Sequence, residues 1–196
     1  MSFLRTTFLS MEDAMAGISQ QELEHAFYVK IDNFDLLSNA TEKQRIEQAS
    51  FYTENKGKGS LMMRSRKINY MASADKQGLE EIIFCTKTPN TGTAGAAQMM
   101  EVELPGSKEQ HALYMQFGSA IFKDRYRFAV VGTTLFWDVD VFLNKDGSYS
   151  NWARLEVEVK DLNAPVPEFP FAVQDSFSAD DNERRDALRK AGLVQQ

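Results

Sequence analysis

The sequence predicts an α+β fold in which an antiparallel β-barrel with a charged interior is flanked by a few helices. Several segments alternate charged and apolar residues with a period of two, as strands with two different faces do. Their charged positions include both acidic and basic pairs, and their opposite faces are rich in apolar residues that can pack against helices. A closed barrel with apolar residues outside and opposite charges facing each other inside satisfies both faces at once.

Length and composition indicate one cytoplasmic domain. The 196 residues carry a net charge of −6, which argues against general nucleic-acid or membrane-surface binding. A phosphate site therefore needs locally gathered lysines and arginines. Cys85 is the single cysteine, which excludes an intrachain disulfide and a cysteine-rich zinc site. Charged residues interrupt the N-terminal apolar stretch, and no apolar run approaches the roughly 18–20 residues of a membrane span.

The first half of the chain is expected to hold mainly strands. Residues 1–20 are an N-terminal extension with a short helix from Ser10 to Ile18, and residues 21–196 form the folded domain. Thr41 and Gln44 match a capping box and predict a helix over about 41–49. The other expected elements are strands over 22–31, 51–53, 61–70 and 81–87, a turn at 56–59 and a loop over 88–98.

The second half is expected to alternate strands, hairpin turns and two helices. A strand over 99–104 ends at a Pro-Gly pair, and Ser107 opens a helix to about Phe117 that Gly118 ends. Three strands follow, with turns at 131–133 and 144–147, the latter containing an Asp-Gly hairpin signal. Three prolines between 165 and 170 end the sheet, and Ser178 is expected to cap a last helix that runs to about Lys190.

Charged residues at positions i and i+2 are the candidate functional residues, because both members of such a pair lie on one face of a strand. For one strand alone, a solvated face is the ordinary interpretation. The repetition of such pairs with both signs favours a shared, enclosed site. The acidic pairs are Glu22/Glu24, Glu101/Glu103, Asp138/Asp140 and Glu156/Glu158, and the basic residues are Arg64/Arg66, Lys123/Arg125 and Lys87 alone.

The order and spacing of these motifs resemble the CYTH superfamily, also called triphosphate tunnel metalloenzymes, over about residues 20–160. Each motif alone is weak, but six in the right order around two capped helices make the resemblance fairly specific. The opening Glu-x-Glu resembles Glu22 and Glu24, the paired arginines resemble Arg64 and Arg66, and the strand lysine resembles Lys87. The later motifs of the family are similar to Glu101 with Glu103, Lys123 with Arg125 and Tyr126, Asp138 with Asp140 and Phe142, and Ala153 with Glu156 and Glu158.

The resemblance implies an eight-stranded antiparallel tunnel that binds a triphosphate group together with Mg²⁺ or Mn²⁺. The implied activity is a metal-dependent phosphohydrolase acting on inorganic triphosphate, or on a nucleoside or thiamine triphosphate. A class IV adenylate cyclase is an alternative within the family, and an RNA 5′-triphosphate end is the one nucleic-acid partner that it admits. The expected assembly is a monomer or a homodimer without a membrane partner.

The resemblance also implies roles for the individual residues. Arginines grip phosphates through two hydrogen bonds and lysines neutralise them as point charges, while these cations prefer carboxylate oxygens. Glu101 and Glu103 either bind the cation or orient the basic residues. The implied sets are Arg64, Arg66, Lys87, Lys123 and Arg125 for the substrate, Glu22, Glu24, Asp138, Asp140, Glu156 and Glu158 for the metal, and Glu22, Glu24, Lys30 and Lys87 for catalysis.

The chain departs from the family at one position of the opening motif. Ala26 stands where the family has a lysine that helps to set up the attacking water or contacts the phosphate chain. Two alternatives therefore stay open, namely hydrolysis and triphosphate binding with little or no turnover. Lys30 lies on the same strand face four residues further on, roughly 13 Å along the strand, and is the expected replacement.

Overall fold

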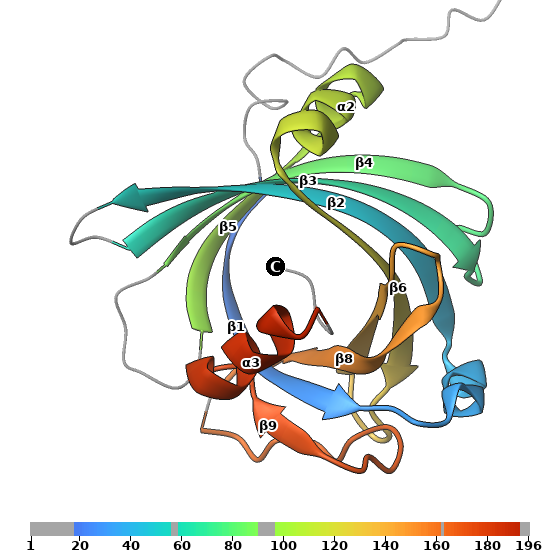
Figure 1. Ribbon diagram of the computed structural model, residues 1–196. Coiled ribbons are helices and arrows are strands. Elements are labelled where there is room, and N and C mark those ends of the chain that lie inside the picture. The colour runs from blue at the N-terminus through green and yellow to red at the C-terminus, as the bar shows by residue number, and fades with distance from the viewer. Residues whose placement is uncertain (1–17, 56–58, 90–96, 162, 193–196) are drawn as a thin grey trace, which may run out of the picture.

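The computed structural model describes residues 18–55, 59–89, 97–161 and 163–192 (Figure 1). These residues form nine strands, a 3₁₀ helix and two α-helices. The helices are η1 (Phe34–Asn39), α2 (Lys108–Phe117) and α3 (Asn182–Lys190). The strands are β1 (Ile18–Lys30), β2 (Glu42–Asn55), β3 (Gly59–Ala72), β4 (Glu80–Pro89), β5 (Ala97–Pro105), β6 (Ser119–Ala129), β7 (Phe136–Leu143), β8 (Tyr149–Glu158) and β9 (Ser176–Ser178).

All strands belong to one antiparallel sheet, in the order β5-β4-β3-β2-β6-β7-β8-β1-β9. The sheet curls round so that β5 also pairs with residues Ile18–Glu24 of β1, and the two strands lie side by side in Figure 1. Residues Glu24–Lys30 of β1 pair with β8, and β9 pairs with β1 on its other edge. The predicted α+β class and antiparallel sheet are confirmed. The sheet is not a regular eight-stranded barrel, because β9 is a ninth strand and β5 joins only the first part of β1.

The predicted helix over 41–49 is wrong, because this segment is part of β2. The backbone of β2 pairs with β3 on one edge and with β6 on the other, and these long pairings override a local helix signal. Thr41 caps no helix here, since its hydroxyl donates to the carbonyl oxygen of Arg127 at 2.9 Å. The strand predicted at 51–53 is the last part of the same β2.

The other predicted strands and the first of the two later helices are confirmed. Ser107 caps α2 as expected, because its hydroxyl accepts from the backbone N–H of Gln110 at 3.2 Å and the Gln110 side chain accepts in return. The turn between β7 and β8 contains Gly147 at a φ of 82°, in the left-handed region that glycine favours. Of the loop predicted at 88–98, residues 88–89 belong to β4 and residues 97–98 to β5, and the rest lies outside the described residues, as does most of the turn predicted at 56–59.

Three details differ from the sequence predictions at the ends of the chain and after β1. Asp181, not Ser178, caps α3, because its carboxylate accepts from the backbone N–H of Arg184 at 3.1 Å. Ser178 lies in β9, and neither β9 nor η1 was predicted. β1 begins at Ile18, within residues 1–20 that were assigned to the N-terminal extension. The helix predicted from Ser10 to Ile18 lies, apart from Ile18, outside the described residues.

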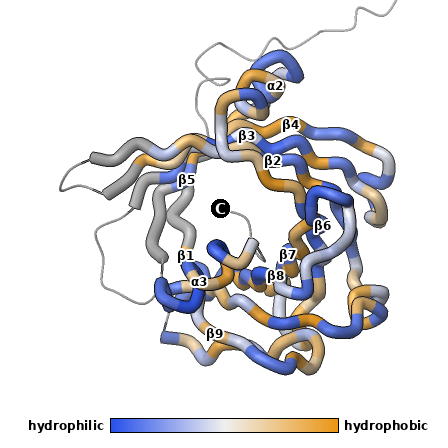
Figure 2. Tube along the Cα trace, viewed as in Figure 1, coloured by the Kyte–Doolittle hydropathy of each residue, from blue (hydrophilic) through white to orange (hydrophobic). Residues whose placement is uncertain are grey.

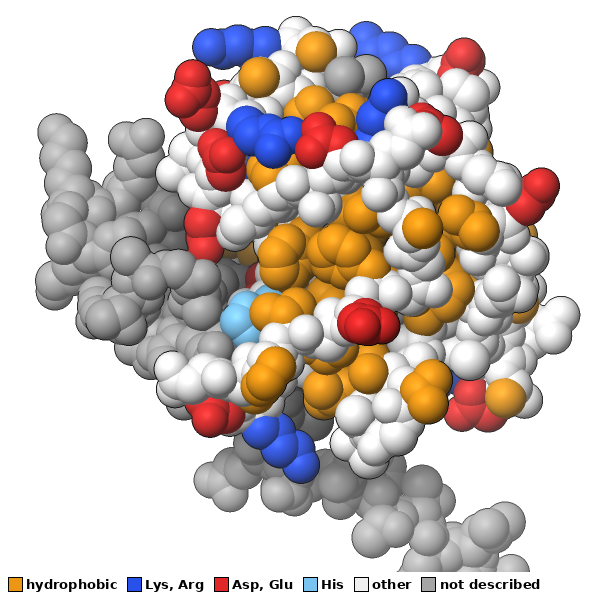
Figure 3. Space-filling view, turned by 90° about the horizontal axis from the view of Figure 1, so that it is seen from below, with side chains coloured by type: hydrophobic (Ala, Val, Ile, Leu, Met, Phe, Trp, Pro, Cys, Tyr) orange, Lys and Arg blue, Asp and Glu red, His pale blue; other side chains and the backbone are white. Residues whose placement is uncertain are grey.

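The main apolar core lies on the outer face of β1 and β6–β8. Its fully buried members include Val29, Trp137, Val139 and Leu155, which alternate with charged residues along their strands, and Figure 2 shows such mixed hydropathy along the chain. The cover comes from η1 and from partly buried side chains of residues 169–173 rather than from long helices. The face at the bottom of Figure 1, where β9 lies, is largely hydrophobic (Figure 3).

The inner face is not charged throughout, which corrects the sequence prediction. One part of it is an apolar cluster of Tyr28, Ile121, Phe142, Trp152 and Phe177. The C-terminal segment contributes Phe177 of strand β9 to this cluster, and Leu188 of helix α3 packs against it. In Figure 1, α3 lies within the outline of the curled sheet. The charged part of the inner face is therefore bordered by an apolar part that the C-terminal segment covers.

Candidate functional site

The inner faces of the strands enclose a cavity of about 720 Å³ whose walls carry charges of both signs. Among the described residues, ten basic and seven acidic side chains line it. Because the whole chain has a net charge of −6, this local basic excess favours an anionic ligand. The basic residues are Arg64, Arg66, Lys87, Lys123, Arg125, Arg127, Arg154, Lys160, Arg185 and Arg189, and the acidic residues are Glu24, Glu101, Glu103, Asp138, Asp140, Glu156 and Glu158.

The cavity brings together nearly all of the residues that the sequence singled out. Lys30 is an exception, because it does not line the cavity and its ammonium lies 3.8 Å from the carboxylate of Asp32. The period of two predicts correctly which face of β1 Lys30 lies on. At that end of the strand, however, the inner face is occupied by the apolar cluster around Tyr28 and Trp152. The expectation that Lys30 reaches into the site is therefore wrong. The side chain of Glu22 lies outside the described residues.

Arg125 on β6 ties together the acids of β7 and β8. Its Nε and Nη2 donate to the two oxygens of Asp140 at 2.7 and 2.8 Å. Nη1 donates to Asp138 at 2.9 Å, and Nη2 also donates to Glu156 at 3.1 Å. Lys123 adds an ion pair to Asp140. This wall of the cavity is therefore a connected and well-paired ionic network.

The basic residues of this network keep its acids ionised. Burial raises the pKa of Asp140, but Arg125 and Lys123 outweigh it and hold that pKa well below its usual range. Burial likewise raises the pKa of Glu156, yet Arg154 and Arg125 lower it overall to about 2. Both carboxylates are therefore negative at neutral pH.

Arg154 links β8 to β1, and the sequence analysis missed it. Its Nη2 donates to Glu24 at 3.2 Å, and its Nη1 pairs with Glu156. The register places Arg154 opposite Tyr28 and Glu156 opposite Ala26, so the arginine reaches along β1 past the alanine to Glu24. A signal for Arg154 was available, because it stands two residues before Glu156 and shares its strand face. The same signal applies to Arg127, which follows Arg125 by two residues.

The carboxylates on β1 and β8 crowd one another. Burial and the charge of Glu156 both raise the pKa of Glu24, and Arg154 only partly offsets them. Glu158 lies directly opposite Glu24 in the strand register. Two or three carboxylates gathered on adjacent strands in this way can offer oxygen ligands to a divalent cation, which would relieve their repulsion.

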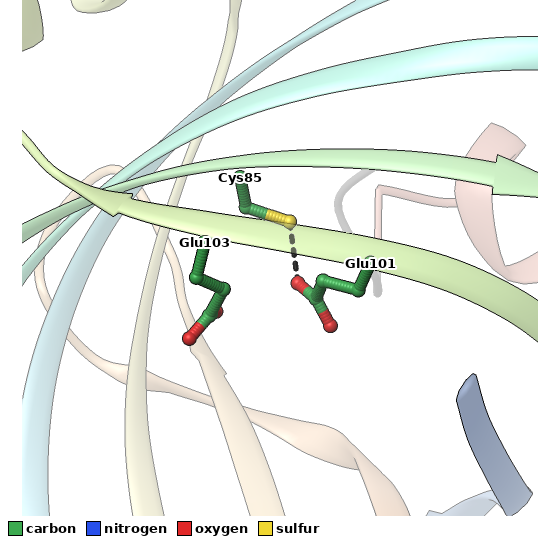
Figure 4. A group of neighbouring side chains, drawn as sticks. All are labelled: Cys85, Glu101 and Glu103. Atoms are coloured by element: carbon green, nitrogen blue, oxygen red, sulfur yellow. Dashed lines mark hydrogen bonds between the residues drawn. The ribbon is translucent and has the colours of Figure 1, made fainter. Parts of the chain in front are cut away.

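The wall formed by β3, β4 and β5 is more strongly basic. Arg64 and Lys87 each lie 2.9 Å from an oxygen of Glu101, and Arg66 pairs with Glu103. The thiol of Cys85 donates to Glu101 (Figure 4).

Cys85, Glu101 and Glu103 have ligand atoms within 4.8 Å of one another and by distance alone could hold a metal ion. Two features oppose a cation there. The two carboxylates already pair with Arg64, Arg66 and Lys87, and burial raises the pKa of the Cys85 thiol to about 12, so the thiol stays protonated. This group therefore serves better to orient the basic residues than to bind a metal.

Four of the arginines that line the cavity have a donor that no group of the described residues satisfies. In Arg64, Arg66, Arg185 and Arg189 the Nε atom is buried and has no hydrogen-bond partner within that part of the chain. A buried donor without an acceptor costs about 1–3 kcal/mol. An anion in the cavity would supply the missing acceptors.

Comparison with known proteins assigns no family to the chain. No model of a known protein family matches it, and no curated protein sequence matches it. Among the described residues, no helix has the length and apolar character needed to cross a membrane.

Proposed function

We propose that this chain is a divalent-metal-dependent phosphohydrolase that acts on a triphosphate-bearing substrate, either inorganic triphosphate or a nucleoside or thiamine triphosphate. The observation that carries the proposal is the cavity itself, which ten basic and seven acidic side chains of the described residues line together. A triphosphate concentrates several negative charges in a short rod that such arginines and lysines can hold. The motif resemblance to the CYTH superfamily points to the same class of reaction.

We also propose that strands β1 to β8 act together as a tunnel around the substrate. The pairing of β1 with both β5 and β8 supports this, because it gives each of these strands two neighbours. In such a tunnel the basic β3–β5 wall holds the phosphate oxygens, with Arg64 and Arg66 offering their unused Nε–H groups. Lys123 and Arg125 stabilise the charge that develops on the phosphates during transfer.

Mg²⁺ or Mn²⁺ is the proposed cofactor, and the carboxylates of β1 and β8 fit it best. Glu24, Glu156 and Glu158 provide hard oxygen ligands, and burial together with the charge of Glu156 raises the pKa of Glu24, an unfavourable environment for its charge that a cation would relieve. Glu22, Asp138 and Asp140 complete the proposed ligand set. A bound cation supplies Lewis acidity towards phosphate oxygens and lowers the pKa of a coordinated water.

The remaining catalytic work falls to Glu24 and Lys87, the members of the implied catalytic set whose described side chains line the cavity. Glu24, buried in the cavity wall opposite Glu158, is the proposed acceptor of a proton from the attacking water. Lys87, held by Glu101 at 2.9 Å, offers positive charge to the substrate.

Ala26 favours a second candidate function, a triphosphate- or nucleotide-binding protein with little turnover. The lysine of the family is missing at this position, and the basic side chain that extends past it is that of Arg154. An arginine stays protonated in proteins, so it can bind a phosphate but cannot exchange a proton with water.

A turnover assay separates these functions. Purified protein is incubated with tripolyphosphate, ATP or thiamine triphosphate, with and without Mg²⁺ or Mn²⁺. We expect metal-dependent phosphate release that falls by at least about tenfold in Glu158→Gln, as for lost metal-site groups. The free energy of unfolding of this variant should change by less than about 0.5 kcal/mol, since Glu158 is exposed. Glu183→Gln, an exposed change on α3, is the matched control.

The other outcomes of this assay are equally informative. Tight binding without phosphate release, with release appearing in Ala26→Lys, would establish the second candidate. Cyclic nucleotide formed from ATP would identify a cyclase. Failure to bind any of the three triphosphates would overturn the proposal.

A further inference from the structure

Helix α3 lies over the apolar part of the cavity and presents two arginines to its charged part. Leu188 packs against the inner apolar cluster together with Ala179, which precedes the helix. Arg185 and Arg189 line the cavity. Positions 185, 188 and 189 share one face of a helix, so the same face that anchors α3 also carries both cations.

The two arginines are not fully used by their neighbours. Arg185 donates through Nη1 to the carbonyl oxygen of Ala179 at 3.2 Å and through Nη2 to Asn182. Arg189 makes one long contact, 3.4 Å from Nη1 to Asp186 within the helix. Both have a buried Nε–H without a partner. An ordinary solvated helix face does not leave such donors buried and unsatisfied.

Arg184 on the same helix behaves differently. It does not line the cavity, its Nη2 donates to Asp175 at 2.7 Å, and its guanidinium lies over the ring of Phe177 at 4.3 Å. The helix therefore has one arginine engaged in holding the C-terminal segment and two that face the cavity.

The basic residues on the strands differ from those on α3 in how their charge is balanced. Lys87, Lys123 and Arg125 each pair with a carboxylate that also lines the cavity. No acidic residue of α3 lines the cavity, and Asp186, the partner of Arg189, is 55 % exposed. The helix therefore brings positive charge to the cavity without bringing the matching negative charge.

We propose that Arg185 and Arg189 form an anion subsite on α3 that binds an additional phosphate of a linear phosphate chain. This inference rests on the proposed function, since it assigns a part of the same cavity. It specifies the ligand class further, as a chain of three or more phosphates that extends from the strand-borne bases to the helix. A ligand with two phosphates gains less from the helix, because it has no third phosphate to place there when the strand-borne bases hold the other two.

The test is isothermal titration calorimetry in metal-free buffer with tripolyphosphate and with pyrophosphate. The proteins are the unmodified chain, Arg185→Gln, Arg189→Gln, the double variant, and Arg184→Gln as the matched control on the same helix. We expect the double variant to lose about tenfold in affinity for tripolyphosphate and less than about threefold for pyrophosphate, on the scale of one charged hydrogen bond or more. Arg184→Gln should change both affinities by less than about twofold.

The single variants keep the test decisive if the double variant fails to fold, because each should lose about threefold for tripolyphosphate alone. Equal losses for both ligands, or a variant indistinguishable from Arg184→Gln, would overturn the subsite while leaving the proposed function in place. If the unmodified chain binds neither ligand, the proposed function fails and the subsite fails with it.

Discussion

The two walls of the cavity contain the same kinds of residue but use them differently. On β6–β8, Arg125 makes four hydrogen bonds to three acids, and Arg127 directs both Nε and Nη2 to Asp138 at 2.8 and 2.9 Å. On β3–β5, Arg64 and Arg66 reach the carboxylates through Nη2 and leave a buried Nε–H unused.

This difference indicates a division of labour within one cavity. A fully paired network stabilises and orients the groups it contains, whereas unsatisfied donors are available to a ligand. The β6–β8 wall is therefore suited to a preorganised framework, and under the proposed function the β3–β5 wall would hold the phosphate oxygens. Variants in the two walls should then differ in stability and in ligand affinity.

The largest expected effect is on stability, in Arg125→Ala. The change leaves the buried Asp140 and the partly buried Asp138 and Glu156 with one fewer cation, and removing one partner of a buried ion pair costs about 3–5 kcal/mol. Urea denaturation measures the free energy of unfolding. Lys145→Ala, in the exposed turn after β7, is the control and should cost less than about 0.5 kcal/mol. A loss below about 1 kcal/mol in Arg125→Ala would show that this wall is not a structural framework.

The second effect is the acid dependence of stability. The folded-state pKa values of Asp140 and Glu156 lie below the unfolded ones, so their stabilisation is complete above the unfolded values near pH 4. It is lost as the pH falls through the folded values, which for Glu156 means about 2. Urea denaturation at a series of pH values should therefore show stability falling between about pH 5 and pH 2. Asp140→Asn should flatten this slope, Asp180→Asn should not, and an unchanged slope in Asp140→Asn would contradict the assignment.

The third effect concerns ligand affinity and compares one arginine from each wall. Arg66→Gln should weaken tripolyphosphate binding by about tenfold, because it removes an arginine with an unused buried donor. Arg127→Gln should weaken it by less than about threefold, because its donors are already used on Asp138. Calorimetry without metal gives both values. Equal losses in the two variants would remove the distinction between the walls.

The smallest effect is expected at Cys85. With its pKa raised to about 12 by burial, the thiol stays protonated, so native protein at pH 7.5 should react with iodoacetamide at least about tenfold more slowly than protein in urea. Cys85→Ser should leave phosphate release within about twofold of the unmodified chain, because a serine hydroxyl can likewise donate to Glu101 and accept from Arg64. Fast native alkylation, or a loss as large as in Glu158→Gln, would instead make Cys85 part of the chemistry.

The sequence was most informative about which side chains share a face. A period of two is a local property, so the pairs at 64 and 66, 123 and 125, and 138 and 140 could be placed on one side of their strands without knowing the fold. Position along the cavity is not local, and for this reason Lys30 was placed on the correct face but in the wrong place. The helix at 41–49 failed for a related reason, because the partners of β2 lie far away in the chain.

The cavity residues that the sequence did not single out divide in the same way, into those that local spacing could reveal and those that only the fold places. Arg127 and Arg154 were within reach of the pattern, but a search for pairs of like charge passes over residues that extend a pair or oppose it in sign. Arg185 and Arg189 were out of reach, since a charged helix gives no local sign that it will lie over a cavity. How α3 docks depends on Leu188 and on the apolar cluster contributed by five strands.

The pairing of β1 affects how the chain folds during synthesis. Its neighbours β5, β8 and β9 come from the middle and the end of the described chain, so β1 has no sheet partner close to it in sequence. Long-range pairings of this kind slow folding, because the entropy of closing a large loop is lost before the contacts form. During synthesis, β1 therefore waits for its first described sheet partner until β5 emerges.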